Sequence, residues 1–481
     1  MQVTKRISTR VILATLPVIF FLLTQLPACS NSGGGAGEVP FVQPGSLISN
    51  EEYAARRTRL MDQVPDGVVI ILGAVTPVET YRFFQNNDFF YFSGVEIPNA
   101  VLVIDGVNRE STLFFTMDER TARGEGLPDG LAADPGGSTG IERAEPSDGL
   151  EPYLAGLSRQ VDVFYTSHFP GELTNINTKE TNNSWRRTMT ENPLDGRLTR
   201  ELQFVEYLKR EYPRVEVKDC ASTIWNMRRI KSPAEVALVR EAARIGVAAH
   251  NELIRNTGVG MTENALAAIF EFICRREGAQ ELAYPTILMS GPNHPFGHYH
   301  IWDRTLQEGE FVILDAGPDY AYYNADISTS FPVNGRFTEY QRELYELANG
   351  IREVCLANYG PGVSLADVGE KVEEWLVAQG HDPTEQRFRG LIRWGGYNHS
   401  IGMATHDVQD SFGDANEPLQ VGFVFACDVN MPIDEDFGLR LEDTVVITED
   451  GCENLSVGVP RTIAEVEAMV RSRGILEIVK R

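Results

Sequence analysis

The chain is poor in cysteine and in positive charge, and both shortages narrow what it can be. Only six of its 481 residues are cysteine, and no two of them stand in a CxxC spacing. A dense disulfide framework is therefore not indicated, although a single disulfide stays open. Lys and Arg total 43 against 68 Asp and Glu, which gives a formal charge of −25. Nucleic acids and anionic membrane surfaces bind positive charge, so we expect neither as a partner.

The apolar run near the N-terminus lacks the length to cross a bilayer as a helix. It reads VILATLPVIFFLL, 13 residues, and it follows the basic residues Lys5, Arg6 and Arg10. A membrane-spanning helix needs about 20 apolar residues, whereas the core of a signal peptide needs fewer. We therefore predict a signal peptide over residues 1–28 and an exported protein.

A cysteine follows this run in a context that indicates lipidation. In LPACSNSGGGAG, Leu26, Ala28 and Cys29 resemble a bacterial lipoprotein cleavage box, with Pro27 where a small residue is usual. The Ser/Gly-rich residues after Cys29 suit a flexible tether, which we predict over 29–45. We expect a periplasmic protein anchored to the outer membrane through Cys29, with no other membrane contact. A conventional signal peptide with an incidental cysteine is the alternative.

The rest of the chain has the composition of a globular protein and the length for two domains. It is 42% hydrophobic and 9% aromatic, as expected of a chain that buries a core. Short apolar runs alternate with amphipathic patterns up to residue 220, which predicts a small α/β domain over 46–220. The predicted strands are 67–73, 100–105, 112–116 and 161–166, with helices near 50 and 200 and loops at 124–140 and 178–196.

Capping signals open a second domain, predicted over 221–481. Ser232 stands at an N-cap, Pro233 follows at the first helical position, and Glu235 completes a capping box. Gly258 is expected to end this helix. Three more helices are predicted after Thr262, after Thr338 with Gln341, and after Ser364 with Asp367. Strand-like segments at 311–316, 320–331, 423–431 and 439–448 alternate with these helices, which makes the domain α+β.

Several acidic residues lie inside those apolar strands, where an unpaired carboxylate is costly. For Asp315 and Asp326 the simpler explanation is that they cap turns, because Asp is common beside Gly, Pro or Asn. The set Asp315, Asp326, His399, Asp428 and Glu442 instead offers four carboxylates and one imidazole. Such a donor set suits Mn²⁺, Fe²⁺, Co²⁺ or Zn²⁺, and bridging carboxylates allow two ions about 3.5–4 Å apart. Strand alternation lets only one of Glu442 and Asp443 face such a site.

Three blocks carry a specific resemblance. They are LDAGPDYAYYNADISTSFPVNG, NHSIGMATHDV and LRLEDTVVITEDG, and they resemble blocks of the methionine aminopeptidase–creatinase superfamily of pita-bread metallopeptidases. KSPAEVALVREAARIG resembles the opening helix of that catalytic fold. YRFFQNNDFFYFSGVEIPNAVLVID, at 81–105, resembles the N-terminal domain of aminopeptidase P and prolidase relatives. The resemblance implies an α+β protein whose C-terminal pita-bread domain follows a smaller α/β domain of creatinase/aminopeptidase P type.

The resemblance also implies a role for each matching residue. Asp315 would bind one metal ion, Asp326 and Glu442 would bridge both, and His399 would bind the second together with Asp428. His298 and His406 would contact the substrate or the tetrahedral intermediate, and Arg440 would orient the bridging glutamate. One position departs from the family, which usually has Glu-Pro-Gly where this chain has Asp428, Val429 and Asn430. Asp428 keeps the charge of that glutamate but withdraws the carboxylate by one methylene, and reach matters for a ligand and for a proton shuttle.

The activity implied is that of an Xaa-Pro aminopeptidase acting through a hydroxide that bridges two divalent ions, Mn²⁺ first among them. Its substrates would be peptides with proline second, and we expect a homodimer or a higher homo-oligomer. A prolidase, which cleaves Xaa-Pro dipeptides, is one alternative. A metal-free amidinohydrolase like creatinase is another, although it usually lacks the acidic ligands kept here. A non-catalytic peptide-binding lipoprotein on a decayed peptidase scaffold is a third, supported by Asp428 alone.

Overall fold

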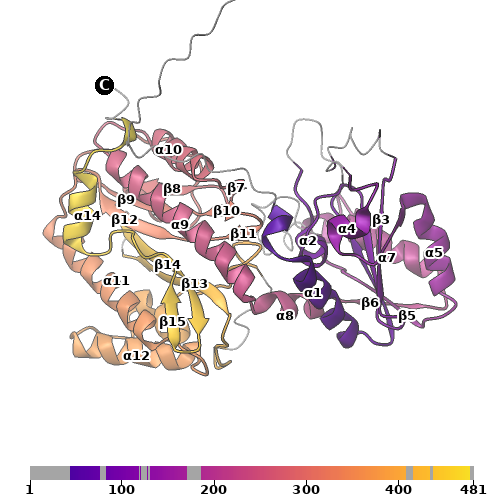
Figure 1. The fold of residues 1–481 in the computed structure, drawn as a ribbon. Coiled ribbons are helices and arrows are strands. Elements are labelled where there is room, and N and C mark those ends of the chain that lie inside the picture. Colours follow the sequence, from indigo (N-terminus) through magenta and orange to yellow (C-terminus); the bar gives the residue numbers. More distant parts are fainter. Residues whose placement is uncertain are drawn as a thin grey trace, which may run out of the picture. The chain divides into compact units, whose positions relative to one another are not determined.

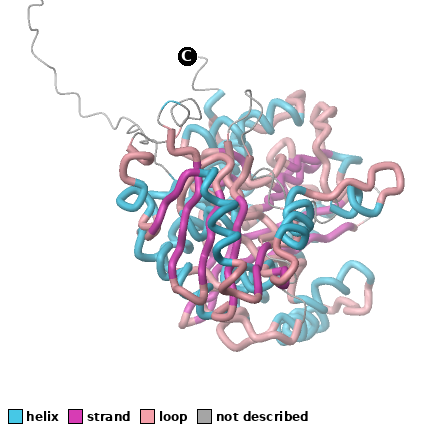
Figure 2. The backbone as a smooth tube through the Cα atoms, turned by 90° about the vertical axis from the view of Figure 1, so that its right-hand side faces the viewer, coloured by secondary structure: helices cyan, strands magenta, loops and turns pink. Residues whose placement is uncertain are grey.

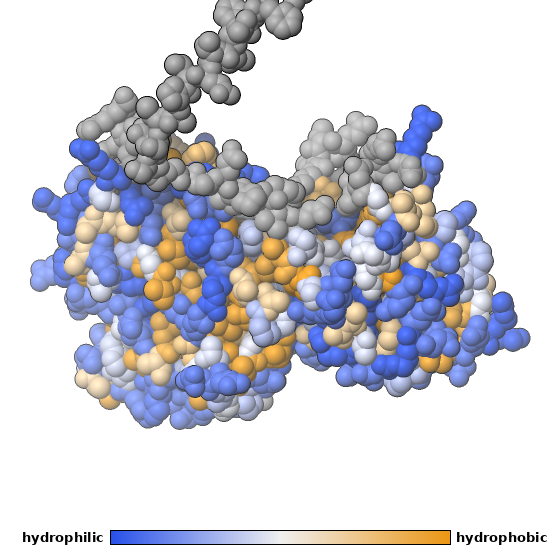
Figure 3. All heavy atoms as spheres, viewed as in Figure 1, coloured by the Kyte–Doolittle hydropathy of each residue, from blue (hydrophilic) through white to orange (hydrophobic). Residues whose placement is uncertain are grey.

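The computed structural model describes residues 44–75, 83–118, 120, 127, 130–170, 186–407, 415–433 and 437–476. The predicted signal peptide, the lipidation site Cys29 and most of the predicted tether lie outside these residues. In the described part of the chain, no helix has both the length and the hydrophobicity needed to cross a membrane. Hydrophilic residues predominate on the face seen in Figure 3, as the charge composition leads one to expect.

The N-terminal half builds a mixed six-stranded sheet in the order β4-β3-β2-β1-β5-β6. Its strands are β1 (Gly67–Leu72), β2 (Val101–Asp105), β3 (Glu110–Phe115), β4 (Arg143–Pro146), β5 (Val163–Thr166) and β6 (Glu216–Asp219). The four strands expected in this region are thus confirmed. The pairs of β1 with β2 and of β2 with β3 are antiparallel, and the other pairs are parallel. In Figure 2 the strands of one sheet run side by side with helices packed across them.

Helices cover both faces of this sheet. They are α1 (Asn50–Gln63), α2 (Asn87–Ser93), α4 (Pro135–Thr139), α5 (Leu150–Leu157), α7 (Arg200–Glu211) and α8 (Ala221–Arg229). Val69 and Ile71 of β1 pack in one core cluster with α1 and α2, whereas Val68 and Ile70 pack in another with α5 and α7. Figure 1 shows α1 and α5 on opposite sides of the strands. A strand buried on both faces explains the unbroken apolar run that it forms in the sequence.

Two loop predictions in this half are corrected. The segment predicted as a loop over 124–140 contains the short helix α4, which Asp134 caps by accepting from the Gly137 amide at 3.0 Å. Residues 186–191, within the second predicted loop, are also helical. The first segment is rich in Gly and the second in Asn and Thr, and such compositions hide a helix that is only one or two turns long.

The C-terminal half holds the larger sheet, in the order β13-β14-β12-β9-β8, with β15 paired to β14. Its strands are β8 (Ile287–Ser290), β9 (Phe311–Asp315), β12 (Ser328–Pro332), β13 (Val424–Pro432), β14 (Gly438–Thr448) and β15 (Gly451–Asn454). A smaller sheet has the order β11-β10-β7, from β7 (Glu281–Leu282), β10 (Pro318–Tyr320) and β11 (Tyr323–Asn324).

The single strand predicted over 320–331 is wrong, because the chain turns back within it. Tyr320 pairs with Tyr323, so Ala321 and Tyr322 form a two-residue hairpin loop, with φ of 53° and 73°. Such loops require positive φ at both positions, which Asn and Gly usually supply. Ala and Tyr give no turn signal, so the sequence conceals the hairpin.

The four predicted caps are confirmed. The helices that they open are α9 (Pro233–Asn256), α10 (Glu263–Arg276), α11 (Glu339–Asn358) and α12 (Leu365–Ala378). Ser232, Thr338 and Ser364 form complete capping boxes, and Thr262 caps α10 with its side chain. The first of these helices ends at Asn256, just before the predicted stop at Gly258. These helices pack on the larger sheet in one apolar core. Shorter helices are α13 (Arg389–Trp394), α14 (Ile463–Val470), η1 (Pro44–Leu47), η2 (Ser147–Gly149), η3 (Gly291–Asn293) and η4 (Gln386–Phe388).

Candidate metal centre

Strand register brings acidic residues from separate parts of the chain into one row. Ser328 of β12 lies opposite Asp315 of β9 on one side and opposite Glu442 of β14 on the other. Glu442 in turn lies opposite Asp428 of β13. Directly opposed residues of antiparallel strands point to the same face of the sheet. The row Asp315–Ser328–Glu442–Asp428 therefore crosses four strands on one face, and all of its members are buried.

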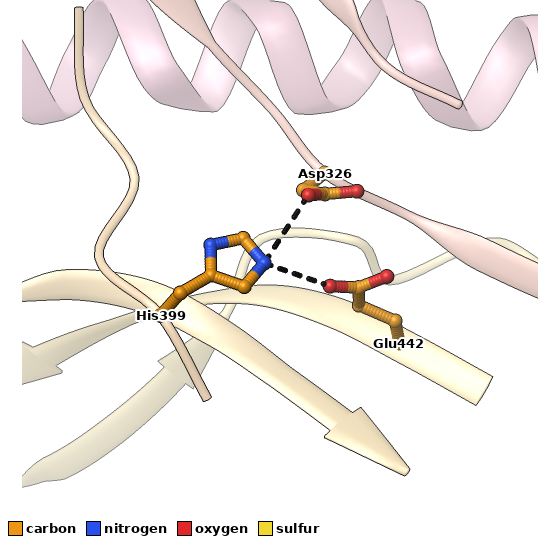
Figure 4. Close-up of side chains that lie close together, drawn as sticks. All are labelled: Asp326, His399 and Glu442. Atoms are coloured by element: carbon orange, nitrogen blue, oxygen red, sulfur yellow. Dashed lines mark ion pairs between the residues drawn. The ribbon is translucent and has the colours of Figure 1, made fainter. Parts of the chain in front are cut away.

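His399 closes the site from the loop that precedes β13. Its Nε2 atom lies 3.4 Å from Asp326 Oδ2 and 3.4 Å from Glu442 Oε1. Figure 4 shows the ring pointing between the two carboxylates. Its Nδ1 atom lies 3.1 Å from the Thr405 carbonyl oxygen, which can only accept, so Nδ1 carries the proton. Nε2 is thus the nitrogen that faces the acids, and a bound cation would meet its lone pair there.

The ligand atoms of three residues are close enough to share one ion. One donor atom each of Asp326, His399 and Glu442 lies within 4.8 Å of the others. Ser328 Oγ donates to the second oxygen of Glu442 at 2.7 Å, which fixes that carboxylate and leaves Oε1 facing His399. Burial would raise the pKa of Glu442, but His399 and Arg440 hold it below its ordinary value.

Tyr284 joins two of the acids through one hydroxyl. The hydroxyl contacts Asp315 Oδ1 at 2.6 Å and also hydrogen-bonds Asp326 Oδ1. It has one proton to donate, so one of the two contacts needs a proton from a carboxyl group. Burial, followed by the negative charges of Glu442 and Asp315, raises the pKa of Asp326 well above its ordinary range. A protonated Asp326 satisfies the second contact, and a bound cation would take the place of that proton.

Arg440 pairs with Asp315, not with the glutamate that it was expected to orient. Its Nη1 atom donates to Asp315 Oδ2, and its backbone amide donates to Ser330 Oγ at 3.0 Å. Burial opposes the charge of this guanidinium, but Asp315, Asp428 and Glu442 raise its pKa above the ordinary value. The hydrogen bond from Arg440 fixes the orientation of the Asp315 carboxylate.

Asp428 gives the strongest sign that the pocket is built for a cation. Its Oδ1 atom is buried and has no hydrogen-bond partner, a costly state for a carboxylate oxygen. Burial and the negative charge of Glu442 raise its pKa well above the ordinary range. An orphaned carboxylate oxygen beside three further acids and one imidazole is the donor set of a divalent metal. The residues present therefore fit the metal that the sequence predicts.

The predicted catalytic histidines lie in different surroundings. The ring of His406 stacks on that of His399, with centroids 3.9 Å apart and planes at 15°. His298 lies exposed in the loop that follows η3, outside the buried row of acids. His294, in the same region, is buried and bridges strands: Gly438 N donates to its Nδ1 at 3.3 Å, and its Nε2 lies 3.0 Å from the Phe311 oxygen.

Sequence reasoning missed three residues that shape this centre, namely Tyr284, Ser328 and Arg461. Arg461 donates to the carbonyl oxygens of Ser328 (2.7 Å) and Glu442 (2.6 Å), and to Asp443 Oδ1 (2.7 Å). Ser328 had a signal, because it stands two residues after Asp326 at the start of a strand. Tyr284 and Arg461 had none, since each acts through partners distant in the chain.

Two family models match the chain. The model described as metallopeptidase family M24 matches residues 237–449. The model described as the N-terminal domain of aminopeptidase P matches residues 53–165. The first range contains all five predicted ligands, and the second contains strands β1 to β4 and all but the last residue of β5.

Known proteins similar to this chain match nearly its whole length. The Xaa-Pro aminopeptidase of Escherichia coli is 29% identical over 466 residues, covering 88% of this chain and 98% of the relative. Among solved structures, the low-pH form of E. coli aminopeptidase P is 30% identical with a TM-score of 0.70, covering 88% of this chain and 98% of that one. Proline aminopeptidase P II from Yersinia pestis has a TM-score of 0.71 at 27% identity, covering 88% and 99%.

Proposed function

Since the chain belongs to metallopeptidase family M24, in the aminopeptidase P branch of the pita-bread superfamily, we propose that it removes the first residue from peptides whose second residue is proline. The observation that carries this proposal is the buried row of acids that His399 faces. Proline blocks many peptidases because its nitrogen has no hydrogen to donate, so a dedicated enzyme is needed for such bonds.

Two divalent ions are the proposed cofactor, with Mn²⁺ first and Co²⁺, Zn²⁺ or Fe²⁺ as alternatives. Asp315, Asp326, His399, Asp428 and Glu442 would hold them. When bound, such a pair supplies a nucleophilic water at neutral pH and polarises the scissile carbonyl. Asp326 and Glu442 would hold metal together with His399, because both carboxylates approach the same nitrogen of that histidine.

The protein's own groups would do the rest of the work. Asp428, which has a buried oxygen without a hydrogen-bond partner, would take the proton of the attacking water and return it to the leaving proline nitrogen. His406 would donate a hydrogen bond to the oxyanion from its place against His399. His298 would reach the peptide from its exposed loop. Arg440 would hold the Asp315 carboxylate in its orientation.

The decisive assay is release of the first residue from an Ala-Pro-Ala tripeptide by the purified protein. We expect turnover that a chelator abolishes and Mn²⁺ restores. An Ala-Pro dipeptide in parallel separates the two enzymes, because a prolidase would prefer the dipeptide. Absence of turnover with Mn²⁺, Co²⁺, Zn²⁺ and Fe²⁺ on both substrates would contradict the proposal.

A non-catalytic peptide-binding protein is the second candidate, and the shortened carboxylate at Asp428 is what favours it. Metal analysis of the dialysed protein separates the candidates. We expect about two ions per chain for the enzyme, because a pair needs both bridging acids. No bound metal together with measurable affinity for Ala-Pro-Ala would favour the binding protein.

The proposed location is the periplasmic face of the outer membrane, reached through a lipid on Cys29. Its support is the sequence of the N-terminus alone. Labelling with radioactive palmitate and fractionation of the membranes tests it, with C29A as the matched variant. We expect label and outer-membrane recovery for the natural chain and neither for the variant. Light scattering of the soluble part would test the proposed homodimer or higher oligomer.

A further inference from the structure

Four charged side chains form a buried cluster outside the metal centre. Arg228 of α8 donates to Asp88 Oδ1 of α2 at 2.7 Å and to Asp407 Oδ1 at 2.5 Å. Lys231 Nζ donates to the other oxygen of Asp407 at 3.1 Å. The side chains of Arg228, Asp407 and Lys231 are each only 1% exposed. The cluster links the N-terminal half, through Asp88, to the end of a segment that carries both site histidines.

That segment, 399–407, is here called the histidine segment. It begins with the predicted ligand His399 and ends with His406 and Asp407. Its middle is anchored by backbone bonds, from Ile401 N to the Val424 oxygen (3.0 Å) and from Asn324 N to the Gly402 oxygen (2.8 Å). Asn87 of α2 donates to the Met403 oxygen at 2.7 Å. Helix α2 therefore touches the segment directly at Asn87 and, through Arg228, at Asp407.

We infer that Arg228 and Asp88 are positioning residues for His406, so that the N-terminal domain sets where this histidine lies beside the metal centre. The inference rests on the proposed function, in which His406 contacts the reacting carbonyl. Asp407 follows His406 directly, so the two arms of Arg228 fix where that histidine lies against His399. A displacement of about 1 Å in such a group can cost about 100-fold in rate.

The balance of charges in the cluster supports a positioning role over a purely stabilising one. Burial raises the pKa of Asp407, but Arg228 and Lys231 hold it below its ordinary value, so the carboxylate stays charged. Buried ion clusters add little net stability compared with apolar packing, while they do impose one arrangement of their members. Arg228 meets two carboxylates through separate nitrogens, a geometry that Lys cannot reproduce.

The test uses D88A and R228K in the full-length protein, with Y322F as the matched control. The Tyr322 hydroxyl also joins the two halves, accepting from Gln85 N at 2.7 Å and donating to Glu96 at 2.8 Å. Neither of these two bonds involves a residue of the histidine segment. Hydrogen exchange of the amides of 399–407 is measured first. Steady-state kinetics on Ala-Pro-Ala follow, for the single variants and for each combined with H406A.

We expect D88A and R228K to speed exchange in the histidine segment and to lower kcat about 10-fold with metal content unchanged, whereas Y322F does neither. In the H406A background the same changes should cost little more, because their effect passes through His406. Unchanged exchange in D88A and R228K, or a full additional loss in H406A, would overturn the inference. If the natural chain itself turns over no peptide, the proposed function is wrong. The hydrogen exchange of residues 399–407 still tests whether Arg228 and Asp88 position the histidine segment.

Discussion

At the scale of single residues, Asp428 and His250 show what burial does to a titratable group. Asp428 keeps a carboxylate oxygen without a partner inside the metal centre, where the family usually carries the longer glutamate. His250 lies buried against the end of β9, with Nε2 3.0 Å from the Ala316 oxygen and Nδ1 3.0 Å from Thr329 Oγ1. The carbonyl can only accept, so Nε2 donates and the neutral ring accepts from the threonine.

The first prediction concerns the proton carrier. D428N should lower kcat/KM on Ala-Pro-Ala by about 100-fold or more, because an amide cannot shuttle a proton. D428E should raise kcat if the shorter side chain limits the natural enzyme. D450N, in an exposed turn, is the control and should change neither parameter. Full activity in D428N would remove Asp428 from the mechanism.

The second prediction concerns acid stability. Burial lowers the pKa of His250 to about 4, from 6.5. As the pH falls, His250 therefore binds a proton near pH 6.5 in the unfolded chain but only near pH 4 in the folded protein. The stability contributed is present above pH 6.5 and is lost as the pH falls toward 4, in all about 3 kcal/mol. Urea unfolding between pH 4 and 7 should show a flatter profile in H250N than in the natural chain. H300N, in an exposed loop, should keep the natural slope.

The identities of the ligands could be read from the sequence, but much of their support could not. Asp326, His399 and Glu442 stand in motifs whose spacing indicates chemistry, and the structure brings them together. Tyr284 precedes Asp315 by 31 positions, and nothing in its neighbourhood marks it as a partner of two acids. Contacts between distant residues depend on packing, which local patterns do not encode.

At the scale of elements, the two strands of the larger sheet that share the fewest paired residues meet beside the metal centre. Strands β12 and β14 share one register pair, Ser328 with Glu442. Arg461 crosses this seam and donates to the carbonyl oxygens of both residues, and to Asp443 on the opposite face. Burial would raise the pKa of Asp443, but Arg461 and Arg352 hold it below its ordinary value.

The third prediction tests this clamp. R461M should lower the free energy of unfolding by about 3 kcal/mol, because it leaves two carbonyl oxygens unsatisfied and Asp443 with one cation. Its affinity for Mn²⁺ should also fall, since the strands carrying Ser328 and Glu442 separate. Chemical denaturation and metal titration measure the two effects. R471M removes an exposed arginine of α14's C-terminus and should cost less than about 1 kcal/mol. Equal losses in both variants would contradict the clamp.

Elements with strong local signals were predictable, and those shaped by their surroundings were not. A hydroxyl residue followed three positions later by an acid or an amide predicts the starts of α9, α11 and α12. The structure forms all three capping boxes. The hairpin at Ala321 and Tyr322 is held instead by its sheet and by the hydroxyl bond of Tyr322 to Glu96. Tertiary contacts there override a sequence that reads as one strand.

At the scale of the whole molecule, proton balance and metal content are linked. Burial and neighbouring negative charge raise the pKa of both Asp326 and Asp428. The metal-free folded protein therefore keeps protons at a pH where the unfolded chain has released them. Their stabilising contribution is present at low pH and is lost as the pH rises through the raised pKa values.

The fourth prediction follows from this linkage. Mn²⁺ must displace these protons, so its affinity should rise with pH and binding should release protons. The melting temperature should increase on addition of Mn²⁺, by more at pH 8 than at pH 5. Metal at 100 times its dissociation constant adds about 2.7 kcal/mol to stability. Calorimetry in buffers of different ionisation enthalpy counts the protons. A pH-independent affinity would show that these acids are already ionised.

The side-by-side acids of β14 have a consequence for insertions and deletions. Glu442 serves the metal face, while its neighbour Asp443 serves Arg352 and Arg461 behind the sheet. A shift of the strand by one position would exchange the two faces. A deletion that moved Asp443 into the place of Glu442 would still give the metal face an acid, but it would leave Arg352 and Arg461 without their counter-ion. The chemistry of the metal centre could accept such a deletion, whereas the ion pairs behind the sheet could not.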